Sequence, residues 1–161
     1  MDVGEFNALP DDEAQRLVAG CLGVPRWVAD VVDGRPYDDR AALRKRAHDA
    51  ALHLSGDELD AALSRHPRIG ERPGGDDDES RHSRAEQSGV VDTDADRLRV
   101  GNAAYEARFG HVFLIRAAGR SGTEILAELE RRLDNDEDTE RAETVTALRD
   151  IALLRLEGLV E

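Results

Sequence analysis

The sequence contains a single cysteine, Cys21, among 161 residues. One cysteine excludes an intrachain disulfide, which suits a reducing compartment. No apolar stretch approaches the roughly 20 residues that cross a bilayer. Residues 1–5 have neither a basic start nor an apolar run of signal length, and residues 158–161 carry no peroxisomal tripeptide. We therefore expect a cytoplasmic protein that does not insert into membranes.

Positive charge is also scarce, since 22 lysines and arginines face 35 aspartates and glutamates and the net charge is −13. Such a surface repels phosphate backbones, and nucleic-acid binding would need a basic stripe. The tight basic run, Arg44-Lys45-Arg46, lies inside a helical pattern and is best explained as a solvated helix face. We expect no nucleic-acid partner. The length and the 40% hydrophobic content suffice for one domain over residues 1–161.

Strand-like alternation is nearly absent, and apolar residues recur at helical spacing along most of the chain. The exception is His111–Arg116, which we expect to form an extended segment across the core near 111–117. Residues 71–79 are rich in Gly, Asp and Pro and predict a loop. The sequence thus predicts an all-α, compact single-domain bundle of about eight helices. The expected helices cover residues 9–23, 25–33, 38–54, 55–65, 80–89, 92–109, 124–133 and 137–159.

A histidine and a later polar helix face are the first candidates for chemistry. The helix before His66 should stop near Arg65, because a residue preceding proline is driven out of the helical region. Ser83, Glu86 and Gln87 would share one face of the next helix, because residues three and four apart project to the same side. A histidine with a pKa near neutral is a natural proton donor at pH 7. Each of these residues alone also has an ordinary structural explanation.

The acidic run Asp76–Glu79, with His82 nearby, raises the possibility of a metal site. Adjacent acids in a glycine-rich loop point in several directions, whereas metal ligands must converge, so a solvated loop is the better reading. Two other functions remain open on the residues alone. One is a helical binding or scaffold protein without chemistry, and the other is a metal-dependent hydrolase using His66, His82 and the aspartate cluster.

Arg155 lies in the apolar stretch Leu153-Leu154-Arg155-Leu156 of the last expected helix. Its guanidinium either snorkels outward to solvent or is buried and paired. If it is buried, it requires a carboxylate or an anionic ligand.

The order and spacing of several blocks resemble those of the 2-oxo-4-hydroxy-4-carboxy-5-ureidoimidazoline (OHCU) decarboxylases, which complete the oxidation of urate to allantoin. The similarity runs over most of the chain. One departure is His111-Val112, where the family often has a Phe-Pro-like pair. The blocks are His66-Pro67-Arg68-Ile69-Gly70, Ser83-Arg84-Ala85-Glu86-Gln87-Ser88-Gly89, Asn102 and Tyr105 leading to Arg108-Phe109-Gly110, Phe113-Leu114-Ile115-Arg116-Ala117, and Leu154-Arg155-Leu156.

The resemblance implies an all-helical enzyme that works without cofactor or metal, acts on OHCU as a small-molecule substrate and commonly forms a homodimer. It implies that His66 is the catalytic acid/base and Glu86 its essential partner. The substrate-binding groups it implies are Pro67, Ser83, Gln87, Arg155 and the backbone of Phe113, Leu114, Ile115, Arg116 and Ala117.

Overall fold

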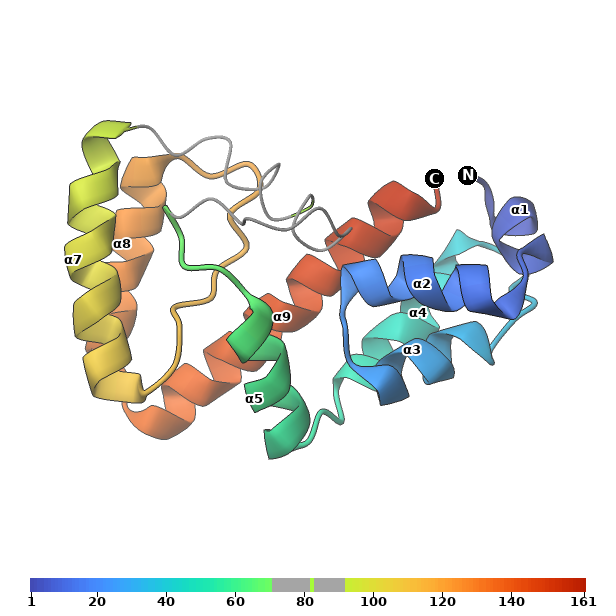
Figure 1. Cartoon of the computed structure of the whole chain (residues 1–161), viewed down its shortest axis with the longest axis horizontal. Helices are drawn as coiled ribbons and strands as arrows, with labels where there is room; N and C mark the ends of the chain where they lie inside the picture. Colours follow the sequence, from blue (N-terminus) through green and yellow to red (C-terminus); the bar gives the residue numbers. More distant parts are fainter. Residues whose placement is uncertain (71–81, 83–91) are drawn as a thin grey trace.

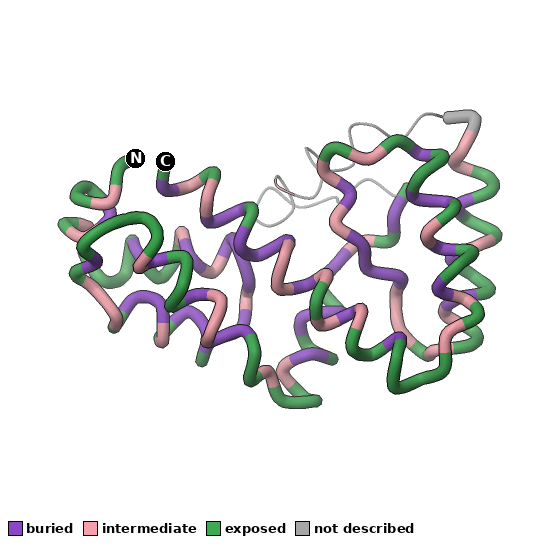
Figure 2. Tube along the Cα trace, turned by 180° about the vertical axis from the view of Figure 1, so that it is seen from behind, coloured by how far each residue is buried: buried purple, intermediate pink, exposed green. Residues whose placement is uncertain are grey.

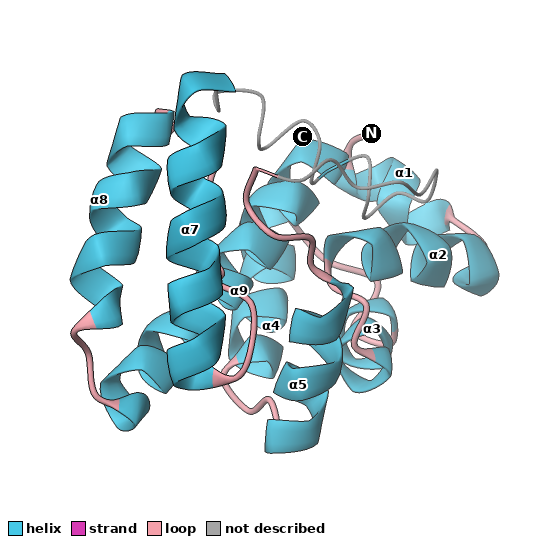
Figure 3. Ribbon diagram, turned by 60° about the vertical axis from the view of Figure 1, so that its left-hand side comes forward, coloured by secondary structure: helices cyan, strands magenta, loops and turns pink. Residues whose placement is uncertain are grey.

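The computed structural model describes residues 1–70, 82 and 92–161. Every regular element in these residues is a helix, which confirms the predicted fold class (Figure 3). The predicted helix over residues 80–89 falls outside the described residues, apart from His82. The helices are α1 (Val3–Ala8), α2 (Asp11–Cys21), α3 (Pro25–Val32), α4 (Arg40–Ala51), α5 (Gly56–Arg65), α7 (Asp92–Phe109), α8 (Gly122–Leu133) and α9 (Glu137–Leu159).

Short-range capping explains most helix starts. The Asp2 carboxylate accepts a hydrogen bond from the Glu5 backbone N–H at 2.9 Å, and the Glu5 side chain accepts one from the Asp2 N–H at 2.9 Å. This capping box begins α1, a helix that was not predicted, since the first helix was expected to start at residue 9. Ser55 and Glu58 form the same box at α5. The prediction that α4 ends near Leu54 was also wrong by about one turn, because the helix ends at Ala51.

The apolar core consists of two clusters joined by α9. The first contains residues of α1 to α5 together with the second half of α9, and Trp27 at its centre donates from Nε1 to the Ala47 carbonyl at 2.9 Å. The second lies between α7 and α8. Figure 1 shows α9 running from the α7–α8 pair to the group formed by α1 to α4. Buried residues occur along α9 both where it packs in the first cluster and nearer the α7–α8 pair (Figure 2).

The predicted extended segment is confirmed. Residues 111–117 form neither helix nor strand, and they pass between the α7–α8 pair and the helices α5 and α9 (Figure 1). Leu114 belongs to the first cluster, whereas Phe113 and Ile115 belong to the second. Gly110 and Gly119 have positive φ angles of 78° and 76°, so glycine suits the turns at the two ends. The segment therefore crosses the core with its direction set at both ends.

No helix among the described residues combines the length and apolar character needed to cross a bilayer.

Candidate functional site

His66 lies at the end of α5, as the following proline predicts. The residue is extended, with φ −77° and ψ 132°, and its backbone N–H donates to the Leu63 carbonyl at 3.2 Å. Only 8% of the residue is exposed. Pro67 is half-buried and follows directly. The end of the helix thus turns the imidazole into the protein interior, not into bulk solvent.

Burial gives this histidine an unusual protonation state. Desolvation lowers the pKa of His66 to about 4, and the positive charges of Arg155 and Arg65 act in the same direction. The sequence-based expectation of a pKa near neutral is therefore wrong for this structure. At pH 7 the imidazole is neutral, with one nitrogen able to donate a hydrogen bond and the other able to accept one.

Arg155 is buried, which decides between the two readings of its position. The residue is 3% exposed, so it does not snorkel to solvent. One guanidinium nitrogen, Nη1, donates to the carbonyl of Cys21 at 3.4 Å. Cys21 is the last residue of α2, where the helix dipole places partial negative charge. The end of α2 therefore stabilises the Arg155 guanidinium inside the protein, close enough for its charge to act on His66.

A second arginine reaches the same part of the fold. Arg65, the last residue of α5, donates from Nη2 to the Gly23 carbonyl in the turn after α2. A Cβ added at Gly23 would lie 2.9 Å from Arg65 Cζ, so a larger residue there would displace the Arg65 guanidinium. Two guanidinium groups thus lie near a neutral imidazole. This arrangement suits an anionic ligand, because arginine binds carboxylates through its planar set of donors.

The extended segment can offer backbone groups to a ligand, but not its apolar side chains. The side chains of residues 113, 114, 115 and 117 are buried in the two clusters, while Arg116 is half-buried. Within the described part of the chain, no group accepts a hydrogen bond from the backbone N–H groups of residues 113–117. These N–H groups remain candidates for binding the polar edges of a ligand.

The structure brings together only part of the predicted site. His66 and Arg155, which are 89 positions apart, are within electrostatic reach of each other. Ser83, Glu86 and Gln87 lie outside the described residues, so their predicted roles are untested. The same holds for the acidic run Asp76–Glu79. Among the residues that are described, no three His, Cys, Asp or Glu side chains are grouped as metal ligands.

A buried polar network around Arg132 was not anticipated from the sequence. Arg132 of α8 is 3% exposed and Glu140 of α9 is 1% exposed, and their side chains form an ion pair at 2.5 Å. Tyr105 of α7 donates from its hydroxyl to the same carboxylate at 2.5 Å. A signal was available, since Arg132 follows Ile125 and Leu129 at helical spacing and so lies on the apolar face of α8.

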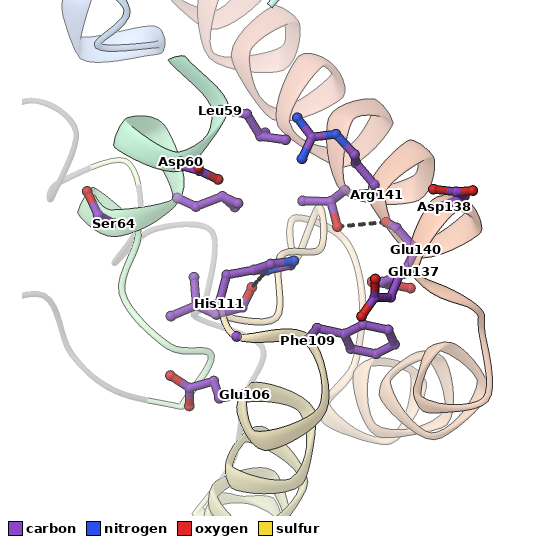
Figure 4. Close-up of a pocket in the computed structure, with 14 residues that line it drawn as sticks. Leu59, Asp60, Ser64, Glu106, Phe109, His111, Glu137, Asp138, Glu140 and Arg141 are labelled. Atoms are coloured by element: carbon purple, nitrogen blue, oxygen red, sulfur yellow. Dashed lines mark hydrogen bonds between the residues drawn. The ribbon is translucent and has the colours of Figure 1, made fainter. Parts of the chain in front are cut away.

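A separate pocket of about 590 Å³ lies between α5, the end of α7 and the start of α9 (Figure 4). His66 and Arg155 are not among its lining residues. His111 lines it, with the ring edge-on to Tyr105 at 5.6 Å and Nδ1 2.9 Å from the Val112 carbonyl oxygen. This pocket is therefore distinct from the group around His66. Its acidic lining consists of Asp60, Glu106, Glu137, Asp138 and Glu140.

Comparison with known proteins gives a consistent result. Residues 7–157 match the family described as OHCU decarboxylase. The chain is 28% identical to the 2-oxo-4-hydroxy-4-carboxy-5-ureidoimidazoline decarboxylase of Haloferax volcanii, over 94% of this chain and 92% of that protein. It is also 28% identical to the enzyme of the same name from Amia calva, over 100% of this chain and 95% of that one.

One relative is much longer than this chain. The uric acid degradation bifunctional protein of Bacillus sp. (strain TB-90) is 24% identical over 99% of this chain, which spans only 32% of that protein.

Two solved structures share the fold. A crystal structure of OHCU decarboxylase in the presence of (S)-allantoin superposes with a TM-score of 0.76 at 23% identity, over 94% of this chain and 98% of that one. A crystal structure of (S)-allantoin synthase gives 0.74 at 16% identity, over 99% of this chain and 54% of the other.

Proposed function

The chain belongs to the OHCU decarboxylase family, and we propose that it converts OHCU to (S)-allantoin and CO2 during urate degradation. The family match over residues 7–157 carries this proposal, and it identifies the protein as a decarboxylase. The buried His66 beside Arg155 provides a chemically suitable site. We further propose that residues 1–161 form one catalytic domain, that the enzyme is a cytoplasmic homodimer, and that it needs no cofactor.

The substrate itself supplies the electron sink for decarboxylation. Its carboxylate is attached to a carbon that also carries a hydroxyl and adjoins a ring C=N bond. When the C–C bond to the carboxylate breaks, its electron pair forms a C=C bond and the C=N pair moves to nitrogen. That nitrogen takes up the one proton that the overall reaction consumes. The enzyme then has to move the hydroxyl proton to the neighbouring carbon on one face, which gives the S product.

A neutral His66 suits this proton transfer. The imidazole accepts the hydroxyl proton and then delivers it, as imidazolium, to the neighbouring carbon, so the histidine ends neutral. A positioned acid/base contributes roughly 10²–10⁴-fold to a rate. Glu86 would orient His66 and stabilise the imidazolium. The proposed substrate-binding groups are Arg155 for the carboxylate or the developing oxyanion, and Ser83, Gln87, Pro67 and the backbone of residues 113–117 for the ring and ureido edges.

The test is an assay on OHCU generated freshly by urate oxidation, followed by chirality-resolved detection of allantoin. Spontaneous decay gives racemic product, so catalysis appears as excess (S)-allantoin. His66→Asn should keep the fold and lose roughly two to four decades of rate. His53→Asn is the matched control, since His53 is exposed. Racemic product from the wild-type enzyme would reject the proposed function, and near-wild-type turnover by folded His66→Asn would reject the role of His66.

A further inference from the structure

The buried pair of Arg132 and Glu140 lies outside the group around His66 and demands an explanation. Arg132 Nε and Nη2 lie 2.9 and 2.5 Å from Glu140 Oε1, and Nη2 also donates to the Thr144 hydroxyl at 3.3 Å. Taking two charges out of water is costly, and well-packed apolar residues often replace such pairs without loss. We therefore expect the pair to have a role other than stabilising the fold.

The remaining guanidinium nitrogen shows what the pair holds. Arg132 Nη1 donates to the backbone carbonyl of Leu114 at 2.6 Å. The same guanidinium lies 4.7 Å from the centre of the Phe113 ring. In the part of the chain that is described, this is the only hydrogen bond that joins the backbone of residues 113–117 to a helix. One side chain thus fixes two consecutive residues of the extended segment.

The network that holds this side chain joins three helices. Glu140 and Thr144 come from α9, Arg132 comes from α8, and Tyr105 comes from α7. Burial and the Glu140 carboxylate raise the pKa of Tyr105, so its hydroxyl stays a donor to Glu140 Oε1. The Tyr105 ring also packs edge-on against Phe113, with ring centres 5.3 Å apart. The segment is therefore held at the Leu114 carbonyl and at the Phe113 ring.

We propose that Arg132, fixed by Glu140, is a positioning residue that holds the backbone of residues 113–117 in the conformation that binds substrate. This inference rests on the proposed function, which assigns the segment backbone to substrate binding. Arginine is required, because a lysine ammonium cannot present a planar set of donors to a carboxylate and a carbonyl while stacking on a ring. Arg132 acts through the segment and does not itself touch the substrate.

The experiment combines Arg132→Lys with two controls. Arg131→Lys changes the neighbouring arginine, which is 49% exposed and pairs with Glu128 and Glu143 on the surface. Leu43→Ala destabilises the core from α4, where Leu43 is buried. We expect Arg132→Lys to raise KM about tenfold with kcat within about threefold of wild type, because a loss of uniform binding raises KM alone. Both controls should keep the wild-type KM.

Amide hydrogen exchange supplies a readout independent of activity. Exchange of residues 110–118 should accelerate about tenfold in Arg132→Lys, while peptides from α2 and α4 keep the wild-type rate. Unchanged exchange in the segment would overturn the inference, and so would faster exchange with an unchanged KM. If the wild-type enzyme lacks activity, the proposed function fails separately and the exchange result still decides whether Arg132 holds the segment.

A second variant covers the case in which Arg132→Lys does not fold. Tyr105→Phe keeps the ring against Phe113 and removes the hydroxyl that supports Glu140. We expect a smaller change in the same direction, about threefold in both segment exchange and KM. Wild-type values for both quantities in this variant would contradict the proposal.

Discussion

Acidification should destabilise this protein through His66. The folded protein holds the pKa of His66 at about 4, against 6.5 for an unperturbed histidine. Below pH 6.5 the unfolded chain therefore binds a proton at this position that the folded chain does not bind. Lowering the pH reduces the free energy of unfolding wherever the unfolded state binds more protons than the folded state. The loss begins near the unfolded pKa and is complete below the folded one.

The size of this loss of stability follows from the difference between the folded and unfolded pKa values of His66. Each pKa unit corresponds to about 1.4 kcal/mol, so the full loss below pH 4 is on the order of 3 kcal/mol. Between about pH 7.5 and about pH 5.5 the linkage relation gives a loss of about 1.4 kcal/mol from His66 alone. This interval stays above the sequence pI of about 4.8, which limits precipitation near zero net charge.

The measurement is urea unfolding of three proteins at both pH values. His66→Asn removes the titrating group, and its other effects on packing cancel when the two pH values are subtracted. The wild type should therefore lose about 1.4 kcal/mol more than His66→Asn on acidification. His53→Asn, which changes an exposed histidine, should follow the wild type. Parallel pH dependence in the wild type and His66→Asn would refute the claim that burial keeps His66 neutral.

Three further predictions address the site and the core. Arg155→Lys should lower kcat/KM at least about tenfold with an unchanged circular dichroism spectrum, because lysine keeps the charge but loses the planar donor set; unaltered kinetics would remove Arg155 from the site. Exhaustive EDTA treatment should leave turnover unchanged, because the substrate supplies its own electron sink; activity lost with a stoichiometric metal and restored by its return would contradict this. Trp27→Ala should cost about 3–5 kcal/mol in urea unfolding, because Trp27 is fully buried and its Nε1 bonds Ala47; a smaller loss would mean that the core closes around the cavity.

Local sequence determined where most helices start and stop. Pro67 ends α5 at Arg65, and Asp39, Ser121 and Asp136 cap α4, α8 and α9 through hydrogen bonds to backbone N–H groups three residues on. Capping and proline geometry act within a few residues, so they can be read without a fold. The missed α1 carried the same kind of signal, a capping box between Asp2 and Glu5.

The extended segment was also predictable, because its run of apolar residues lacks helical spacing and is bounded by Gly110 and Gly119. The sequence could place Ser83, Glu86 and Gln87 on a shared helix face, and that assignment remains a prediction. The family resemblance supplied the reaction, which the match over residues 7–157 supports.

The properties that make a site of these residues were decided by tertiary structure. The sequence offered His66 as a proton donor, yet burial, the distant Arg155 and the neighbouring Arg65 keep it neutral. It left Arg155 either exposed or buried, and the carbonyl end of α2 settled that choice. Helix propensity, capping and periodicity act between near neighbours in the chain. Desolvation and charge–charge interaction depend on distances between residues that only packing brings together. Packing therefore sets both the protonation of His66 and the burial of Arg155.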